Sequence, residues 1–281
     1  MNQLHQTVLK LDKFFYDLYR NKEASQTEVV NFFNNYVVFI LQYNKLDFSD
    51  WQINLHLQKK FKSTIQEFTV KQPKKKKLKL RNKENVKKSQ YNKFASTIAC
   101  CDIDRTAHIL DIYLNKNNCS AKNIEDLGAF VDGVSSLGHE VEHFVQEFIS
   151  GDLVQACEDC YQKKVEAFNK YLGYNGTKGK MVRKLAEKLH SHADAFAITN
   201  SCEINADNNA VVYFNELFKL IKTLTNRESN YYYFIYDICI DLERIQQYRE
   251  FSYEQSIHQD EATKKSLVRD FGIAEDALEI I

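Results

Sequence analysis

The sequence predicts a mostly helical α+β protein with a small antiparallel sheet and flanking helices. Apolar residues recur every three to four positions along much of the 281-residue chain, a spacing that places them on one face of a helix. One proline and eight glycines are too few for a loop-rich all-β fold. Two short runs rich in Ile, Cys, Tyr and Leu, at 97–103 and 107–114, predict a β-hairpin.

Residues 2 to about 70 are predicted to form three helices. The second is expected to begin at a cap provided by Ser25 or Thr27. The third is expected to run from Asp50 to Phe68. The first carries an apolar stripe at helical spacing, formed by Leu4, Val8, Leu11, Phe15 and Leu18.

A strongly basic run separates this N-terminal region from the rest. Residues 71–88 hold ten lysines and arginines and one glutamate, and such runs repel themselves and favour solvated linkers. An import signal or a polyanion contact are the alternatives, but no aromatic side chain is interleaved for base stacking. We therefore predict an N-terminal helical region at 1–70, a linker at 71–90 and a core at 91–281, without a nucleic-acid partner.

Composition bounds the location and the partners. The 38 basic and 38 acidic residues balance, so net charge favours no partner. Seven scattered cysteines are expected to be reduced thiols. With no signal-peptide core and no apolar stretch long enough to span a bilayer, we expect a soluble cytoplasmic protein without a membrane partner. Delivery into a host cell is also compatible with this composition, and the oligomeric state is left open.

The chemistry is concentrated in one predicted helix, at about 123–149. His139, Glu140 and His143 fit the H-E-x-x-H pattern, in which two histidines one turn apart can bind one zinc ion. Glu140, about 100° round the helix from His139, can take a proton from a zinc-activated water and deliver it to the leaving group. The histidines lie opposite the centre of an apolar stripe made by Leu127, Phe130, Val134, Leu137, Val141, Phe144 and Phe148.

A catalytic zinc site needs a third protein ligand. The chain lacks the x-x-Gly-x-x-His continuation of metzincins after His143. A further helix predicted at 178–199 offers His190, beside Asp194 and three small residues that permit close helix approach, Ala186, Ala193 and Ala197. Surface histidines on a lysine-rich helix are the alternative interpretation.

These motifs resemble the gluzincin class of zincin peptidases, over about residues 97–197. In small members the second metal helix has the pattern Glu-x-x-Ala-Asp/Asn-x-Phe-Ala, with the Glu as ligand and the Asp or Asn supporting a ligand histidine. The resemblance implies zinc ligands at His139, His143 and His190, Glu140 as general base and Asp194 as the supporting residue. His190 replaces the usual Glu, so Asp194, Glu187 or a lost site remain alternatives.

Two further features accompany the resemblance. Gln146 matches a glutamine that often follows three residues after the second histidine in such proteins. The hairpin before the motif fits the edge strand with which zincins pair an extended substrate. Glu142 and Glu147 are expected to be solvated, while Tyr213 or the tyrosines at 231–233 either stabilise an oxyanion or pack in the core.

The sequence thus predicts a zinc metallopeptidase, a hydrolase whose partner is a protein or peptide substrate. A non-catalytic helical interaction protein with a degenerate or accidental motif is the alternative. Hydrolysis of a non-peptide amide is a third possibility within the same chemistry.

Overall fold

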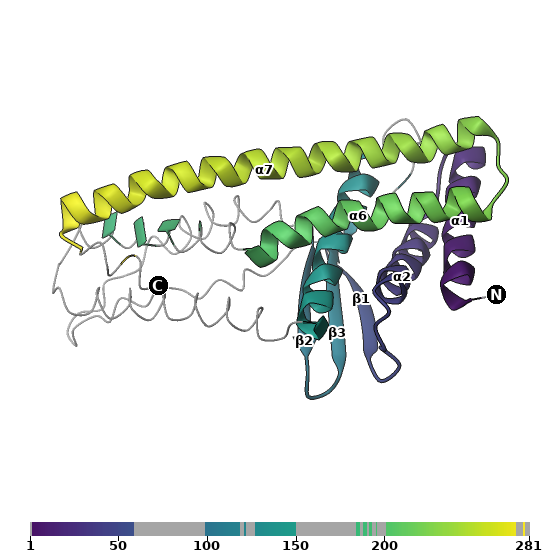
Figure 1. The fold of residues 1–281 in the computed structure, drawn as a ribbon, viewed down its shortest axis with the longest axis horizontal. Coiled ribbons are helices and arrows are strands. Elements are labelled where there is room, and N and C mark those ends of the chain that lie inside the picture. The colour runs from purple at the N-terminus through teal and green to yellow at the C-terminus, as the bar shows by residue number, and fades with distance from the viewer. Residues whose placement is uncertain are drawn as a thin grey trace. The chain divides into compact units, whose positions relative to one another are not determined.

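The computed structural model describes residues 2–58, 99–118, 121, 127–149, 201–273 and 278, with seven further positions between 184 and 195 (Figure 1). The chain forms two compact units. The first contains Met1–Phe61, Ala95–Gly151 and Asn205–Arg249, and the second contains Lys62–Phe94, Asp152–Ile204 and Glu250–Ile281. The N-terminal helices and the motif therefore share one unit. The predicted linker at 71–90 lies outside the described residues.

Two N-terminal helices form as predicted. Helix α1 spans Gln3–Asn21 and buries Val8, Leu11, Phe15 and Leu18 of the expected stripe, while Leu4 is partly buried. Helix α2 spans Gln26–Tyr43 and begins at Ser25, whose side chain accepts a hydrogen bond from the Glu28 amide while Glu28 bonds back to the cap. This reciprocal capping satisfies two amides that a helix start otherwise leaves without acceptors, and it decides between Ser25 and Thr27.

The third predicted helix is wrong over residues 52–58, because Gln52–Gln58 forms strand β1. Ile53 and Leu57 are four residues apart and suit a helix, but Leu55 between them is also apolar. That alternation has a period of two, which places Ile53, Leu55 and Leu57 on one face of a strand.

The sheet is mixed rather than wholly antiparallel. The predicted hairpin is present as β2 (Ala99–Asp104) and β3 (Ile109–Asn115), followed by the short 3-10 helix η1 (Lys116–Asn118). Strand β3 pairs antiparallel with β2 and parallel with β1, giving the order β1-β3-β2. The prediction of an antiparallel sheet is wrong because β1 pairs parallel with β3. Strand β2 lies at an edge of the described sheet.

The motif lies on a helix at 128–149, hereafter the motif helix. It is followed among the labelled elements by α6 (Ser201–Leu224) and α7 (Ser229–Phe271). Aromatic rings join these helices to the N-terminal pair: the ring centroids are 5.3 Å apart for Phe32 and Phe130 and 5.8 Å for Phe15 and Phe214. The mostly helical α+β class is confirmed for the described residues.

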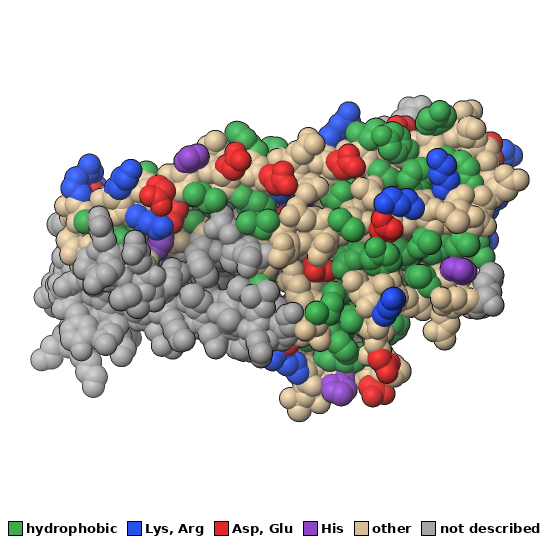
Figure 2. All heavy atoms as spheres, in the orientation of Figure 1, with side chains coloured by type: hydrophobic (Ala, Val, Ile, Leu, Met, Phe, Trp, Pro, Cys, Tyr) green, Lys and Arg blue, Asp and Glu red, His purple; other side chains and the backbone are tan. Residues whose placement is uncertain are grey.

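The surface and the helix lengths bear on the predicted partners. No helix in the described part of the chain is long and apolar enough to cross a membrane. On the face drawn in Figure 2, described side chains of both charge signs are interspersed with hydrophobic ones. That mixture describes this face alone, because the basic run at 71–88 lies outside the described residues.

Candidate metal centre

The motif helix is fixed by the apolar stripe that the sequence indicates. Phe130, Val134, Leu137, Val141 and Phe144 are fully buried, whereas Phe148, beyond them, is 40% exposed. This burial sets the rotation of the helix and turns the histidines away from the stripe. They are nevertheless not surface residues, because only 14% of the His139 side chain is exposed.

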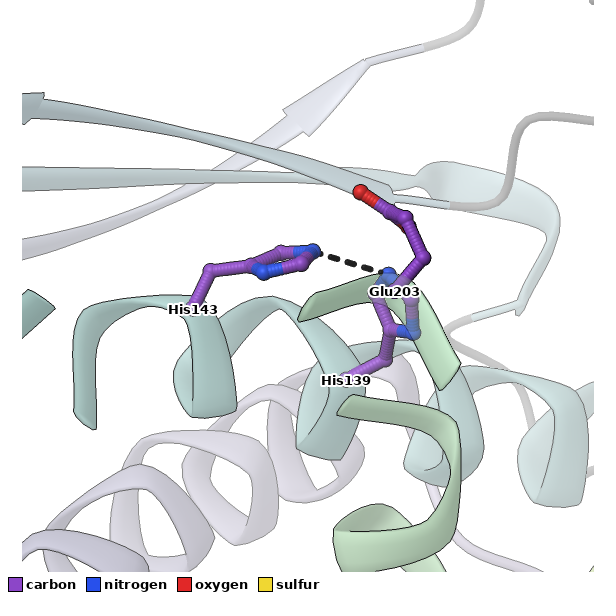
Figure 3. A group of neighbouring side chains, drawn as sticks. All are labelled: His139, His143 and Glu203. Carbon is purple, nitrogen blue, oxygen red and sulfur yellow. Dashed lines mark hydrogen bonds between the residues drawn. The ribbon is translucent and has the colours of Figure 1, made fainter. Parts of the chain in front are cut away.

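The two motif histidines meet at their Nε2 atoms. His139 Nε2 and His143 Nε2 are 3.0 Å apart, and the rings are perpendicular with centroids 4.6 Å apart. Figure 3 shows the imidazoles on successive turns of the motif helix, directed toward one another, with Glu203 reaching them from α6. The pairing that H-E-x-x-H predicts on a helix is therefore present.

Both histidines are held through their other ring nitrogen. Asp207 Oδ1 on α6 lies 2.8 Å from His139 Nδ1, and Gln146 Oε1 lies 3.3 Å from His143 Nδ1. When each Nδ1 donates to its oxygen, the Nε2 of the same neutral ring carries a lone pair that can bind a metal. An outer hydrogen bond of this kind is typical of metal-binding histidines.

Glu203 in the first turn of α6 supplies a third donor. One carboxylate oxygen of Glu203 and a nitrogen of each histidine all lie within 4.8 Å of one another. Among the described residues this is the group of three or more His, Cys, Asp and Glu side chains close enough to hold a metal ion. His190, Asp194 and the alternative Glu187 lie outside the described residues, and His192 bonds instead to Asp260, with Nδ1 2.6 Å from Oδ1.

The signal for Glu203 was present in the sequence. Glu203, Ala206, Asp207 and Ala210 reproduce the spacing Glu-x-x-Ala-Asp-x-x-Ala, with Asn209 where the gluzincin pattern has Phe. The predicted match to that pattern begins thirteen residues earlier, at His190. Asp207 occupies the supporting position of the pattern, and its bond to His139 is the contact that was expected of Asp194.

These donors fit zinc. Zinc binds imidazole nitrogen at about 2.0–2.1 Å with tetrahedral angles, which places two nitrogens about 3.3 Å apart, close to the observed 3.0 Å. Two histidines and one glutamate form a known donor set for catalytic zinc, with a fourth position left for water or substrate.

A close helix crossing brings α6 to the motif helix. A Cβ atom at Gly138 would meet Ala210 Cβ at 3.0 Å and Ala210 Cα at 3.1 Å. These distances leave no room for a side chain at 138 without a shift. Gly138 directly precedes His139, so the close approach places Asp207 beside the imidazole.

Glu142 and Glu147 are not solvated, contrary to expectation. Glu142 is 4% exposed, and it accepts hydrogen bonds from Asn209 Nδ2 (2.8 Å) and the Tyr213 hydroxyl. Glu147, with 8% of its side chain exposed, pairs with Arg105 in the β2–β3 turn. Burial and the Glu142 carboxylate raise the pKa of Tyr213.

The tyrosine hydroxyls considered for an oxyanion role make other bonds. Tyr213 donates to Glu142, as described, and Tyr231 donates to Asp12 Oδ1 at 2.7 Å. Tyr232 donates to the Thr225 carbonyl at 2.8 Å. These three tyrosines therefore agree with the alternative of packing in the core. Tyr233 is 66% exposed, and among the described residues no contact joins it to His139 or His143.

Arg249 of α7 and His139 both contact the same carboxylate oxygen of Asp207. The guanidinium pairs with Asp207 Oδ1, and its Nη2 lies 3.5 Å from Ser136 Oγ on the motif helix. Asp207 is only 3% exposed, and burying a carboxylate is costly unless it is paired and hydrogen-bonded. Burial raises the pKa of nearby Asp132, and the charge of Arg249 opposes that rise.

Glu140 is half-buried on the motif helix. Its carboxylate lies near the Cys100 thiol of β2: burial, followed by the charges of Glu140 and Asp102, raises the pKa of Cys100 to about 11. The proposed base and the edge strand therefore flank the same region. The thiol stays protonated at neutral pH, so Cys100 is not a nucleophile there.

Comparison with known proteins adds no relative. No family model, no curated protein and no solved structure matches this chain.

Proposed function

We propose that the protein is a zinc-dependent metallopeptidase with a zincin-like core, whose metal ligands are His139, His143 and Glu203. The observation that carries the proposal is the pair of Nε2 atoms 3.0 Å apart, with each Nδ1 already bonded to an acceptor. With each Nδ1 donating, the two Nε2 atoms face one point and could hold one cation between them.

Glu140 is the proposed general base. When bound at such a site, zinc acts as a Lewis acid that lowers the pKa of water to near 7 and polarises a carbonyl. Glu140 lies about 100° round the helix from His139, beside rather than among the ligands. Its carboxylate would accept a proton from the attacking water and return it to the departing amine nitrogen.

A peptide is the proposed substrate because of strand β2. Its pairing with β3 occupies one edge, and its other edge faces no strand among the described residues. An extended peptide can add to such an edge through main-chain hydrogen bonds. Glu140 near Cys100 of that strand would then lie beside the scissile bond.

The test measures metal and cleavage in the same preparations. We expect about one zinc per wild-type chain by elemental analysis, and cleavage of an unfolded-protein mixture detected as new peptide termini by mass spectrometry. Glu140→Gln should keep the zinc and lose cleavage, since an amide fills the space but does not accept the proton. His258→Ala, at an exposed position on α7, is the matched control and should retain both.

Two results would contradict the proposal. Wild-type protein prepared without chelators and free of any transition metal would reject the metal centre. Zinc binding without cleavage, identical in wild type and Glu140→Gln, would favour the non-catalytic alternative with a structural metal.

A further inference from the structure

We propose that Glu142, a buried residue between the two motif positions Glu140 and His143, is a positioning residue that fixes the rotation of α6 against the motif helix. It would thereby hold Asp207 and Glu203 at the histidine pair. This inference rests on the proposed metal centre and adds to it a residue that touches neither metal nor substrate.

Both oxygens of Glu142 bind to α6. Oε1 accepts from Asn209 Nδ2 at 2.8 Å, and Oε2 accepts from the Tyr213 hydroxyl. Asn209 and Tyr213 are four residues apart, so they lie on one side of α6, one turn from each other. A two-point attachment to one side of a helix resists both sliding and rotation.

The attachment extends to α2. The hydroxyl oxygen of Tyr213 accepts a hydrogen bond from Asn44 Nδ2 at 3.0 Å, and Asn44 is the residue at which α2 ends. Tyr213 thus connects the motif helix, α6 and α2. This connection explains why a carboxylate is placed at a 4% exposed position, where a charge without hydrogen bonds would be costly.

The two sides of the helix crossing act together. Gly138 and Ala210 form the close contact; on one side Asp207 bonds to His139, and on the other Glu142 bonds to α6. Side-chain tips lie about 5–6 Å from a helix axis, so rotating α6 by about 20° would move its carboxylates by about 2 Å. Zinc–ligand distances tolerate only about 0.2 Å, so rotation control at this crossing decides whether the ligands meet.

The matched pair of variants is Tyr213→Phe and Tyr231→Phe. Each removes one tyrosine hydroxyl from one buried carboxylate in the first unit, Glu142 and Asp12 respectively. We expect Tyr213→Phe to raise the zinc dissociation constant about 10-fold, the scale of outer-contact losses. The two variants should lower the melting temperature by similar amounts. Tyr231→Phe should leave the zinc dissociation constant unchanged.

The measurements use the full chain. Zinc affinity is obtained by competition with a fluorescent chelator, and Co²⁺ absorption in place of zinc reports ligand geometry. Glu142→Gln should weaken zinc binding about 10–100-fold and alter the cobalt spectrum. The double variant Glu142→Gln/Tyr213→Phe should bind zinc no more weakly than Glu142→Gln alone. Both substitutions act on the same connection between the motif helix and α6, so their effects should not add.

Each outcome decides the proposal. Unchanged zinc affinity and cobalt spectra in both Tyr213→Phe and Glu142→Gln would overturn the positioning role while leaving the metal centre intact. If Glu142→Gln does not fold, Tyr213→Phe and Asn209→Ala provide the same comparison. A wild-type chain that binds neither zinc nor cobalt would reject the metal centre itself, and the positioning role with it.

Discussion

Two buried aspartates in the first unit have nearly the same surroundings and different consequences. Asp12 is 2% exposed and binds Arg227 (2.7 Å) and the Tyr231 hydroxyl (2.7 Å). Asp207 is 3% exposed and binds Arg249 and His139 Nδ1 (2.8 Å). In each case an arginine compensates the carboxylate, and a ring supplies the second hydrogen bond.

The second donor makes the difference. Tyr231, which donates its hydroxyl to Asp12, has no second polar ring atom, and this cluster joins α1 to the α6–α7 connection. An imidazole has a second nitrogen, and His139 directs it at His143. A similar buried ion pair therefore supports the fold in one place and, in the other, orients a histidine that we propose as a metal ligand.

The largest expected effect comes from removing the nitrogen that His139 faces, Nε2 of His143. His143→Ala should reduce bound zinc from about one per chain to none, since two ligands remain where a catalytic site needs three. Elemental analysis after gel filtration measures this, and circular dichroism of the metal-free protein should stay near wild type. Full zinc occupancy in His143→Ala would place the metal elsewhere.

Matched aspartate changes should separate stability from metal binding. Asp12→Asn should lower the free energy of unfolding in urea by about 2–4 kcal/mol. This is somewhat less than for a fully buried pair, because 31% of the Arg227 side chain is exposed. Its zinc affinity should not change. Asp207→Asn should weaken zinc binding about 10–100-fold, and equal affinities in the two variants would refute the distinction.

The arginines should differ less strongly. Arg249→Ala removes the charge that compensates Asp207, and we expect zinc affinity to fall about 10-fold in a chelator competition. Arg244→Ala is the control on the same helix, because Arg244 forms an exposed pair with Asp241 at 2.9 Å. That control should bind zinc as wild type does; a loss equal to that of Arg249→Ala would show a general effect of α7.

The smallest effect is expected at an exposed counterpart of the Asp207–His139 pair. His56 Nε2 lies 2.7 Å from Asp111 Oδ1 on the sheet surface, and exposed pairs contribute at most about 1 kcal/mol. The hydrogen bond from His56, followed by that from Asn54, lowers the pKa of Asp111. The stabilisation is therefore present above the ordinary carboxyl pKa and is lost as pH falls through the lowered value.

His56→Ala should accordingly make unfolding less sensitive to pH. Between pH 5 and pH 2 the wild type should lose slightly more stability than the variant, and zinc affinity at pH 7 should be the same. Urea unfolding across that pH range measures the difference. A steeper loss in the variant would reverse the sign derived from Asp111.

Local patterns predicted most of the helices and the motif, and failed where two periods compete. The stripe around Val134 and Val141 was recognised because it repeats over several turns. Residues 52–58 were assigned to a helix because Ile53 and Leu57 suit both a helix and a strand. Pairing with β3, over fifty residues later in the chain, favours the strand, and no window of local sequence contains that interaction.

The sequence by itself determined how His139, Glu140, His143 and Gln146 lie relative to one another on their helix. Positions three and four apart on a helix have a geometry set by the backbone alone. The tertiary structure decided what surrounds them. Asp207 is 68 residues from His139 and Arg249 is 113 residues from Ser136, and Glu142 becomes a buried acceptor only because α6 crosses at Gly138. Contacts between distant helices depend on how side chains fill the space at their crossing, and spacing along one helix carries no information about that fit.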